Sequence, residues 1–243
     1  MQEAVKPYNK EESKKRQVGT MFDNIAPYYD FLNRLLSLRM DVLWRRKAVA
    51  TIRDKSAKTI LDVATGTADL TLELNRQLNP TKIIGMDLSN EMLEIGRDKV
   101  AKKGLEDKVR LDQGDSENLQ YEDQTFDVVT VAFGVRNFEN LSRGLKEIHR
   151  VLKSKGQIVV LEFSRPTIFP FKQVFNGYFK YILPLIGRVT SKDPKAYQYL
   201  YESVQAFPDG EDFLAELEKI GFNSNRCKKL SLGICSIYTG FKH

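Results

Sequence analysis

Between residues 59 and 163, short apolar segments rich in β-branched side chains alternate with longer segments that have the spacing of amphipathic helices. We expect strands at Thr59–Val63, Lys82–Met86, Val109–Leu111, Asp127–Phe133 and Gln157–Phe163. Helices are expected after the first strand, along a face with Leu70, Leu74 and Leu78, and over Ser89–Lys103 and Leu141–Leu152. Strands separated by helices form a parallel sheet covered on both faces. The pattern therefore predicts an α/β fold, a doubly wound Rossmann-like sheet.

The segments that flank this core have other patterns. From Met21 to Trp44, apolar side chains recur at helical spacing, which predicts a helical N-terminal cover. Residues 165–207 combine many aromatic side chains with four prolines, and we expect an inserted helical lobe over the sheet. A last helix, capped by Asp209 and closed by Gly221, is expected to precede two strands in the tail, Lys228–Phe241, around Gly233.

The composition is typical of a folded protein from a reducing compartment. Apolar residues at 42% and charged residues at 29% allow a sizeable core, and two cysteines are too few for a disulfide scaffold. No apolar run approaches the ~20 residues of a membrane-spanning helix, and the first residues lack the apolar segment of a signal peptide. We therefore expect a cytoplasmic protein.

The net charge of +6 is concentrated at one end of the chain. Residues 1–58 hold 13 Lys/Arg against 7 Asp/Glu, whereas residues 59–243 hold 25 of each. Such a surplus could attract the phosphates of nucleic acid or of an anionic membrane surface. A solvated arm ending in Lys14-Lys15-Arg16 is an equally good interpretation, so the charge by itself identifies no partner.

The turn after the first strand is expected to hold a ligand, because parallel α/β sheets bind ligands beyond the carboxyl ends of their strands. Gly66 in this turn lets a ligand approach the backbone, while Ala64 and Ala68 stand where further glycines would be expected. The turn has neither the G-x-G-x-x-G motif of dinucleotide sites nor the G-x-x-x-x-G-K-[ST] motif of triphosphate sites. A nicotinamide dehydrogenase is therefore disfavoured, and a purely structural tight turn remains an alternative.

Acidic residues follow the next two strands. Asp87 lies 21 residues after Gly66, where nucleoside sites place an acid on the ribose hydroxyls. Asp115 and Ser116 follow the third strand, and their carboxylate and backbone amide suit an adenine edge. An adenosine site with few phosphate-binding groups predicts S-adenosylmethionine as the cofactor, whose positive sulfonium suits acidic loops. A helix cap or a solvated turn explains each acid taken alone.

Two further pairs of polar residues lie near the predicted strand ends. Asp62 and Asp69 flank the turn and are candidates to hold the methionine ammonium, although a buried structural role explains Asp62 equally well. Arg136 and Asn137 follow the fourth strand, where a methyl acceptor is expected. They are candidate catalytic residues, because together they can hold a phenolate-like oxygen or order a water that takes its proton. A structural ion pair is the alternative for Arg136.

Three stretches of the chain resemble one known family. They are Tyr29–Ser37 with Leu43-Trp44, Arg150–Lys153 with Gly156 and Leu161–Ser164, and Phe133–Asn137. From about Met21 to its C-terminus the chain is similar to the quinone C-methyltransferases of menaquinone and ubiquinone biosynthesis, which are class I S-adenosylmethionine-dependent methyltransferases. The resemblance implies that the quinol lies near Arg136 and Asn137, and that the cofactor contacts Thr67, Asp87, Asp115 and Ser116.

The chain departs from the family pattern at a few positions. Asp41 stands where the N-terminal signature has His, which leaves the role of that position open. Ser154-Lys155 replace a Pro-Gly pair. Ala64 and Ala68 are small enough to keep the cofactor assignment, provided that both residues have negative φ.

The resemblance implies C-methylation of a polyprenyl quinol without a metal. Demethylmenaquinol is the first candidate acceptor, and the benzoquinol of ubiquinone synthesis is the alternative. The aromatic lobe would be a lid over the isoprenoid tail, or a second small core. The proton acceptor is left open among Tyr28, Tyr29, Asp30, His149 and a water held by Arg136.

An acceptor that dissolves in the bilayer implies transient contact of the basic arm and the lobe with an anionic membrane surface. A homo-oligomer is left open. A methyltransferase for RNA is disfavoured, and no nucleic acid is expected, because residues 59–243 are charge-balanced. A cofactor-binding module without catalysis is the remaining alternative.

We predict a single methyltransferase domain over residues 1–243, since this length suits one hydrophobic core and no repeat or long linker interrupts it. Its expected parts are a mobile basic arm (1–20), the helical cover (21–58), the cofactor-binding core (59–164), the lid lobe (165–207), and a C-terminal helix with strands that complete the core (208–243).

Overall fold

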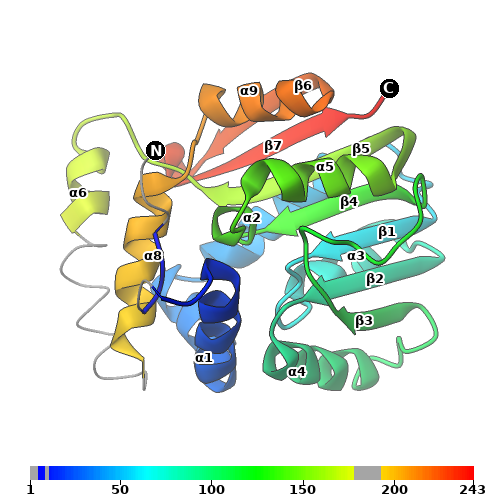
Figure 1. The fold of residues 1–243 in the computed structure, drawn as a ribbon, viewed down its shortest axis with the longest axis horizontal. Helices are drawn as coiled ribbons and strands as arrows, with labels where there is room; N and C mark the ends of the chain where they lie inside the picture. The colour runs from blue at the N-terminus through cyan, green and yellow to red at the C-terminus, as the bar shows by residue number, and fades with distance from the viewer. Residues whose placement is uncertain (1–4, 9–10, 178–192) are drawn as a thin grey trace.

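A computed structural model describes residues 5–8, 11–177 and 193–243 of the chain. Within these residues, seven strands form one sheet in the order β3-β2-β1-β4-β5-β7-β6 (Figure 1). The strands are β1 (Thr59–Val63), β2 (Lys82–Asp87), β3 (Val109–Gln113), β4 (Phe126–Ala132), β5 (Leu152–Phe163), β6 (Asn223–Leu230) and β7 (Cys235–Phe241). Strands β1 to β5 pair in parallel, and β7 lies antiparallel to both β5 and β6. The predicted α/β fold class is confirmed.

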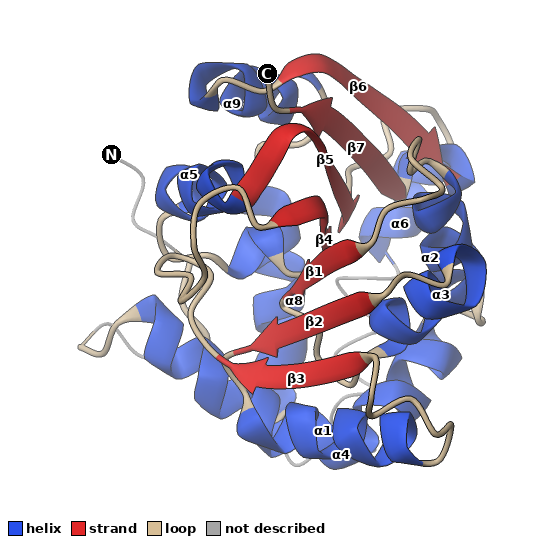
Figure 2. Cartoon of the chain, turned by 90° about the vertical axis from the view of Figure 1, so that its right-hand side faces the viewer, coloured by secondary structure: helices blue, strands red, loops and turns tan. Residues whose placement is uncertain are grey.

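Helices cover both faces of the sheet (Figure 2). The helices around the sheet are α2 (Met40–Ala50), α3 (Asp69–Leu78), α4 (Asn90–Ala101), α5 (Leu141–Val151) and α9 (Glu211–Ile220). Successive residues of a strand point to opposite faces. Ile60 accordingly packs in one core cluster with side chains of α2, α3 and α4, whereas Leu61 packs in another with side chains of α5 and α9. The sheet is therefore doubly wound.

A third apolar cluster lies beyond the edge of the sheet where the parallel strands end. It joins α1 (Lys14–Leu36) to the lobe helices α6 (Phe171–Gly177) and α8 (Pro194–Ala206). Its buried members include Val18, Met21, Phe175 and Tyr199. The predicted lobe thus contains helices that pack on the N-terminal cover; its residues 178–192 lie outside the described part of the chain.

Several predicted boundaries were wrong. Helix α1 begins at Lys14, so residues 14–20 are helical and do not belong to a mobile arm; Lys14 and Val18 are buried there. Strand β5 begins at Leu152 rather than at Gln157, and β6 begins at Asn223 rather than at Lys228. Every second residue of β6 from Ser224 to Lys228 is exposed, so the segment lacks the apolar content that sequence patterns detect.

The expectation of negative φ at the two alanines of the first turn was also wrong. Ala64 has φ 55° and Ala68 has φ 65°, both in the left-handed region. The turn after β1 tolerates Ala64 because it faces Gly134, where a Cβ would come within 2.4 Å of the alanine Cβ. Space for the alanine methyl group therefore comes from a glycine 70 residues away in sequence.

Candidate active site

Two cavities adjoin at the end of the sheet where the parallel strands finish. The strand-end cavity, of about 60 Å³, lies between α1 and the loops that follow β1 to β4. The lobe cavity, of about 470 Å³, lies between α1, α2, α6 and α8. Three aromatic side chains line both: Phe22, Tyr29 and Phe133. The two cavities therefore adjoin at these three rings.

The loops after β1 and β2 meet at Asp87 in the strand-end cavity. The Gly66 amide donates to Asp87 Oδ2 at 2.8 Å, and the Ser89 amide donates to Oδ1 at 3.0 Å. Burial, opposed by these amides, raises the pKa of Asp87 to about 6. The Leu88 amide also binds this carboxylate, which leaves room for at least one further donor. A Cβ added to Gly66 would meet only Tyr29, at 4.0 Å, so the space beside this backbone is open.

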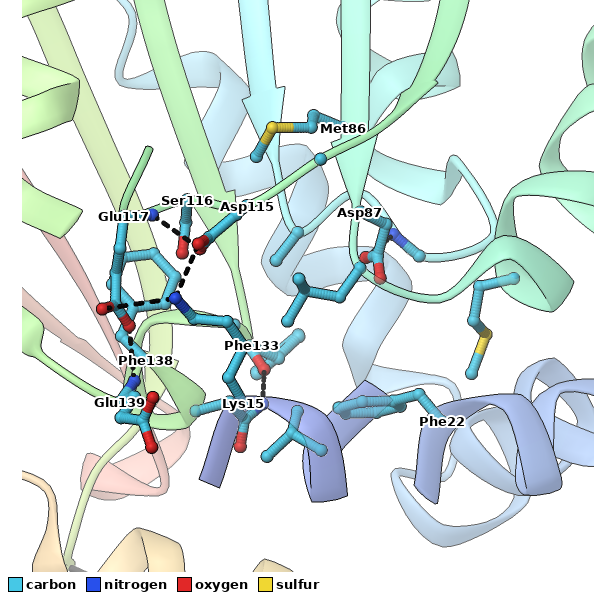
Figure 3. A pocket seen from close by; sticks show the side chains of 18 of the residues that line it. Lys15, Phe22, Met86, Asp87, Asp115, Ser116, Glu117, Phe133, Phe138 and Glu139 are labelled. Carbon is cyan, nitrogen blue, oxygen red and sulfur yellow. Dashed lines mark hydrogen bonds and ion pairs between the residues drawn. The ribbon is translucent and has the colours of Figure 1, made fainter. Parts of the chain in front are cut away.

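The loop after β3 contributes Asp115, Ser116 and Glu117 to the same cavity (Figure 3). Asp115 Oδ1 accepts from the Glu117 amide at 2.9 Å. Its other oxygen binds Lys15 Nζ of α1 at 2.6 Å, and Glu117 lies 3.6 Å from the same ammonium. A lysine from the predicted arm thus occupies the carboxylate that we had expected to face an adenine edge.

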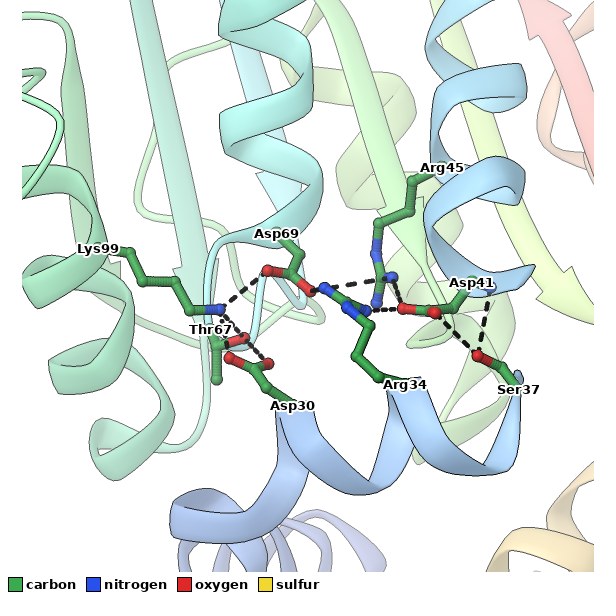
Figure 4. Close-up of polar contacts among 8 residues, drawn as sticks. All are labelled: Asp30, Arg34, Ser37, Asp41, Arg45, Thr67, Asp69 and Lys99. Carbon is green, nitrogen blue, oxygen red and sulfur yellow. Dashed lines mark hydrogen bonds and ion pairs between the residues drawn. The ribbon is translucent and has the colours of Figure 1, made fainter. Parts of the chain in front are cut away.

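Thr67 does not line the strand-end cavity, although the other predicted cofactor residues Gly66, Asp87, Asp115 and Ser116 do. Its side chain is turned towards α1 and α4, where the hydroxyl donates to Asp30 at 2.6 Å and accepts from Lys99 at 2.9 Å (Figure 4). Thr67 therefore connects the turn after β1 to α1 and α4.

The two acids proposed for the methionine ammonium already have partners. Asp62 is 1% exposed and accepts hydrogen bonds from the hydroxyls of Thr65, Thr71 and Thr130 at 2.7–2.8 Å. This is the structural alternative that the sequence left open. Burial acts against ionisation of Asp69, but the nearby Arg45 and Lys99 lower its pKa to about 2.

Asp69 belongs to a charged network that also contains Asp41 (Figure 4). Asp41 is 4% exposed, accepts from Arg45 at 2.6 Å and from Ser37 at 2.8 Å, and is paired with Arg34. Arg34 in turn pairs with Asp69. The residue that departs from the family signature therefore ties α1 to α2 and, through Arg34, to the start of α3.

Helix α1 contacts the loops that follow all four strands β1 to β4. Its polar contacts, in chain order, are Lys14 Nζ to the carbonyls of Arg136 and Phe138 at 2.9 and 3.0 Å, Lys15 to Asp115, Asp23 to Ser89 at 2.6 Å, and Asp30 to Thr67. One helix thus forms a wall across the whole strand-end cavity.

Arg136 and Asn137 lie in a short helix, η1 (Val135–Asn137), directly after β4. Arg136 lines the lobe cavity and Asn137 lines the strand-end cavity, so the pair lies where the two cavities meet. Arg136 Nη1 donates to Glu162 Oε1 at 2.7 Å, and the Glu162 side chain is fully buried. Asn137 Oδ1 accepts from the Tyr199 hydroxyl of α8 at 3.1 Å. The ion pair that was the structural alternative for Arg136 is present, and the catalytic role of Arg136 at the acceptor stays a prediction.

The geometry reduces the candidates for a proton acceptor. His149 packs edge-on against Phe222, 5.0 Å between ring centres, and lines neither cavity. Asp30 is held by Thr67 and Lys99, and Tyr28 is 45% exposed. Tyr29 lines both cavities, and burial raises the pKa of its hydroxyl. Its hydroxyl therefore stays protonated, and a water held by Arg136 stays the predicted proton acceptor.

Sequence reasoning missed three residues of this site. Glu162 carries a detectable signal, because a lone acid interrupts the apolar segment Ile158–Phe163. Lys15 and Tyr199 carry none, since they reach Asp115 and Asn137 from 100 and 62 residues away.

Comparisons with known proteins agree with this architecture. Residues 10–242 match the ubiE/COQ5 methyltransferase family. A demethylmenaquinone methyltransferase of Bacteroides fragilis is 45% identical over 241 residues, covering 99% of this chain and 98% of the relative. A ubiquinone/menaquinone biosynthesis C-methyltransferase UbiE of Geotalea daltonii is 44% identical over 230 residues, covering 94% of this chain and 97% of the relative. A crystal structure of a SAM-dependent methyltransferase from Thermotoga maritima superposes with a TM-score of 0.66 at 18% identity, covering 93% of this chain and 99% of that one.

Proposed function

The chain belongs to the ubiE/COQ5 methyltransferase family, and we propose that it transfers the methyl group of S-adenosylmethionine to a ring carbon of demethylmenaquinol, giving menaquinol. The observation that carries the proposal is the junction, at Arg136 and Asn137, of the strand-end loops that carry Asp87 and Asp115 with a large apolar cavity. The demethylmenaquinone methyltransferase name of the relative matched over 99% of this chain favours the naphthoquinol acceptor.

The residues of the strand-end cavity fit S-adenosylmethionine. Asp87 has acceptor capacity beyond its backbone amides and would accept from the ribose, and the open backbone at Gly66 would lie against the ligand. Asp115 and Ser116 would hold the adenine edge once Lys15 leaves the carboxylate. When bound, the cofactor supplies an electrophilic methyl group on a positive sulfonium.

The lobe cavity fits the acceptor. Its volume of about 470 Å³ lies within the usual range for small-molecule sites, and its walls are mainly aromatic and aliphatic side chains from α1, α2, α6 and α8. A naphthoquinol ring against Phe133 would place its oxygen near Arg136, with the prenyl tail among the lobe helices. Apolar walls also exclude water from the reacting atoms.

Arg136 is the residue best placed to activate the ring. A quinol ring carbon becomes nucleophilic as the quinol oxygen shares or loses its proton, and a guanidinium stabilises the negative charge that develops on that oxygen. Glu162 and the Phe133 carbonyl, 2.7 and 2.6 Å from Nη1, keep the side chain in place. The ring carbon would take the methyl group as the S–CH3 bond breaks with its electron pair left on sulfur, and its hydrogen would then leave as a proton to a water at the junction. Holding ring and methyl in line supplies much of the acceleration.

The decisive experiment is a methyl-transfer assay with isotopically labelled S-adenosylmethionine. Reduced demethylmenaquinone should be labelled, and a reduced benzoquinol analogue in a parallel reaction reports the alternative acceptor. Circular dichroism establishes that the protein is folded. Incorporation into neither quinol by the folded protein would overturn the proposal.

We also propose that the protein is cytoplasmic and touches an anionic membrane surface through the rim of the lobe cavity. Leu38 and Phe171 line the cavity and are 83% and 39% exposed, and Phe169 nearby in sequence is 77% exposed. Lys14 and Lys15 of the basic segment are engaged by the protein itself, which shifts the expected contact from the arm to this rim. Among the described residues, no helix is long and apolar enough to cross a membrane.

Vesicle sedimentation tests this contact. Wild-type protein should sediment with phosphatidylglycerol-containing vesicles at low salt, and Leu38→Asp with Phe169→Asp should reduce the bound fraction several-fold. Glu94→Ala, on the exposed side of α4, is the control. Absence of wild-type binding, or equal binding of the rim variant, refutes the contact without affecting the methyl-transfer proposal.

A further inference from the structure

Tyr199 brings a polar group of the lobe to the reaction loop. The residue lies on α8, is 2% exposed and lines the lobe cavity. Its hydroxyl donates to Asn137 Oδ1 at 3.1 Å, and Asn137 is 8% exposed. Burying a hydroxyl is unfavourable unless it is hydrogen-bonded, and phenylalanine would fill the same volume without that requirement. The hydroxyl therefore needs an explanation beyond packing.

The hydroxyl is suited to donating a proton in a hydrogen bond, not to removing one from the substrate. Burial raises the pKa of Tyr199 above its usual value; the charge of Arg136 acts in the opposite direction and that of Glu162 in the same direction. Tyr199 thus remains neutral at physiological pH and lies within the electrostatic reach of the Arg136–Glu162 pair. A neutral phenol keeps the proton that it donates to the Asn137 amide oxygen.

The orientation of Asn137 is set from two sides. Tyr199 donates to its oxygen, while its nitrogen lies 3.5 Å from the carbonyl of Phe133, which can only accept. A flipped amide would place oxygen against oxygen at Phe133, and the Tyr199 hydroxyl would have to accept from the amide nitrogen instead of donating. The amide that lines the strand-end cavity is therefore held by a side chain from the lobe and by the backbone after β4.

We propose that Tyr199 is a positioning residue that transmits occupancy of the lobe cavity to Asn137. The inference rests on the proposed function, in which the lobe holds the prenyl tail and Asn137 faces the junction with the cofactor. A tail that packs against α8 holds Tyr199 against Asn137, and the amide then has one orientation when the ring arrives. A quinol without a prenyl tail does not support α8, so the Tyr199 hydroxyl should increase its kcat less.

The test compares Tyr199→Phe with wild type on prenylated and tail-less reduced demethylmenaquinone. We expect kcat for the prenylated quinol to fall about 10-fold, as for loss of one buried hydrogen bond. The tail-less quinol should lose less than about 2-fold, and the Kd for S-adenosylmethionine should not change. Tyr201→Phe removes a hydroxyl from the same helix without touching either cavity and should behave as wild type.

A double-mutant cycle with Asn137→Ala separates positioning from a structural role. If Tyr199 acts through the amide, Tyr199→Phe will have no further effect on kcat in the Asn137→Ala background. Equal 10-fold losses in both backgrounds, unchanged kcat in Tyr199→Phe, or equal losses with both quinols would each overturn the inference. Wild-type turnover of the prenylated quinol is measured first, so failure of the proposed function is seen separately as absence of that turnover.

Discussion

The two cavities are built from different kinds of contact. The strand-end cavity is lined by loops that each follow a parallel strand, so the order of strands in the sheet brings Gly66, Asp87 and Asp115 together. The lobe cavity is lined mainly by α1, α2, α6 and α8, and only Phe133, Arg136 and Phe163 reach it from the ends of β4 and β5. One half of the site is thus set by sheet topology, and the other by the docking of helices.

Because the two cavities are built differently, mutations in each should affect different steps of the reaction. Changes at strand ends should alter cofactor affinity and leave the acceptor unaffected, whereas changes in the lobe should alter the acceptor and leave the cofactor unaffected. Residues at the junction should alter catalysis without altering either affinity by much.

The largest effect is expected at the junction. Arg136→Ala removes the guanidinium that stabilises the developing oxygen charge, so kcat should fall about 10²- to 10³-fold. The Kd for S-adenosylmethionine, measured by calorimetry, should change less than about 2-fold. Arg110→Ala is the matched control, since that exposed arginine pairs with Asp112 away from both cavities. Loss of cofactor binding in Arg136→Ala would remove the distinction between junction and strand-end residues.

The second-largest effect is expected in the strand-end cavity, where the affinity for the cofactor should depend on pH. Because burial raises the pKa of Asp87 to about 6, the carboxylate becomes protonated as pH falls from 7.5 to 5, and its oxygens become poorer acceptors for ribose hydroxyls. The Kd for S-adenosylmethionine should therefore rise up to about 10-fold over this range. Asp87→Asn should bind about 10-fold more weakly at pH 7.5 and lose the pH dependence. Parallel pH profiles of the two proteins would show that another group titrates.

A smaller effect is expected in the lobe. Phe175 of α6 is 4% exposed and lines the lobe cavity. Phe175→Ala removes wall area, so KM for prenylated quinol should rise about 5- to 10-fold. KM for a tail-less quinol and the cofactor Kd should stay within about 2-fold of wild type. Equal increases in KM for both quinols would place the tail elsewhere.

The smallest effect is expected for Lys15 of α1, the helix that forms a wall of the strand-end cavity, and it concerns the rate of cofactor association. Lys15→Met removes the ammonium from Asp115. A partly exposed ion pair contributes about 0–1 kcal/mol, so the association rate constant for S-adenosylmethionine should rise no more than about 5-fold. Stopped-flow fluorescence measures this rate, with Arg16→Met as the control because Arg16 lies next in sequence and is 76% exposed in its side chain. A slower association in Lys15→Met would show that the lysine recruits the cofactor instead of excluding it.

The same contrast explains what could be predicted from the sequence. Apolar periodicity and strand order are local signals, and they placed Asp87 and Asp115 at one edge of the sheet correctly. The position of Tyr199 depends on how α8 docks on η1, which no local pattern encodes. Lys14 was assigned to a mobile arm because its segment is highly charged, yet its ammonium is buried on carbonyls 122 and 124 residues away. Thr67 lies in the predicted loop and lines a small pocket with Gly66, but Asp30 and Lys99 bind its hydroxyl, so its contact with the cofactor stays a prediction.

The position of α1 has a consequence for the catalytic cycle. The helix is fastened to the loops after all four strands, and the space beneath it is about 60 Å³, too little for a nucleoside. We expect these attachments to slow departure of the spent nucleoside, a step distinct from the chemistry. A rapid-quench experiment should accordingly show a burst of methylated product followed by a slower steady rate, and added salt should quicken that second phase while leaving the burst unchanged.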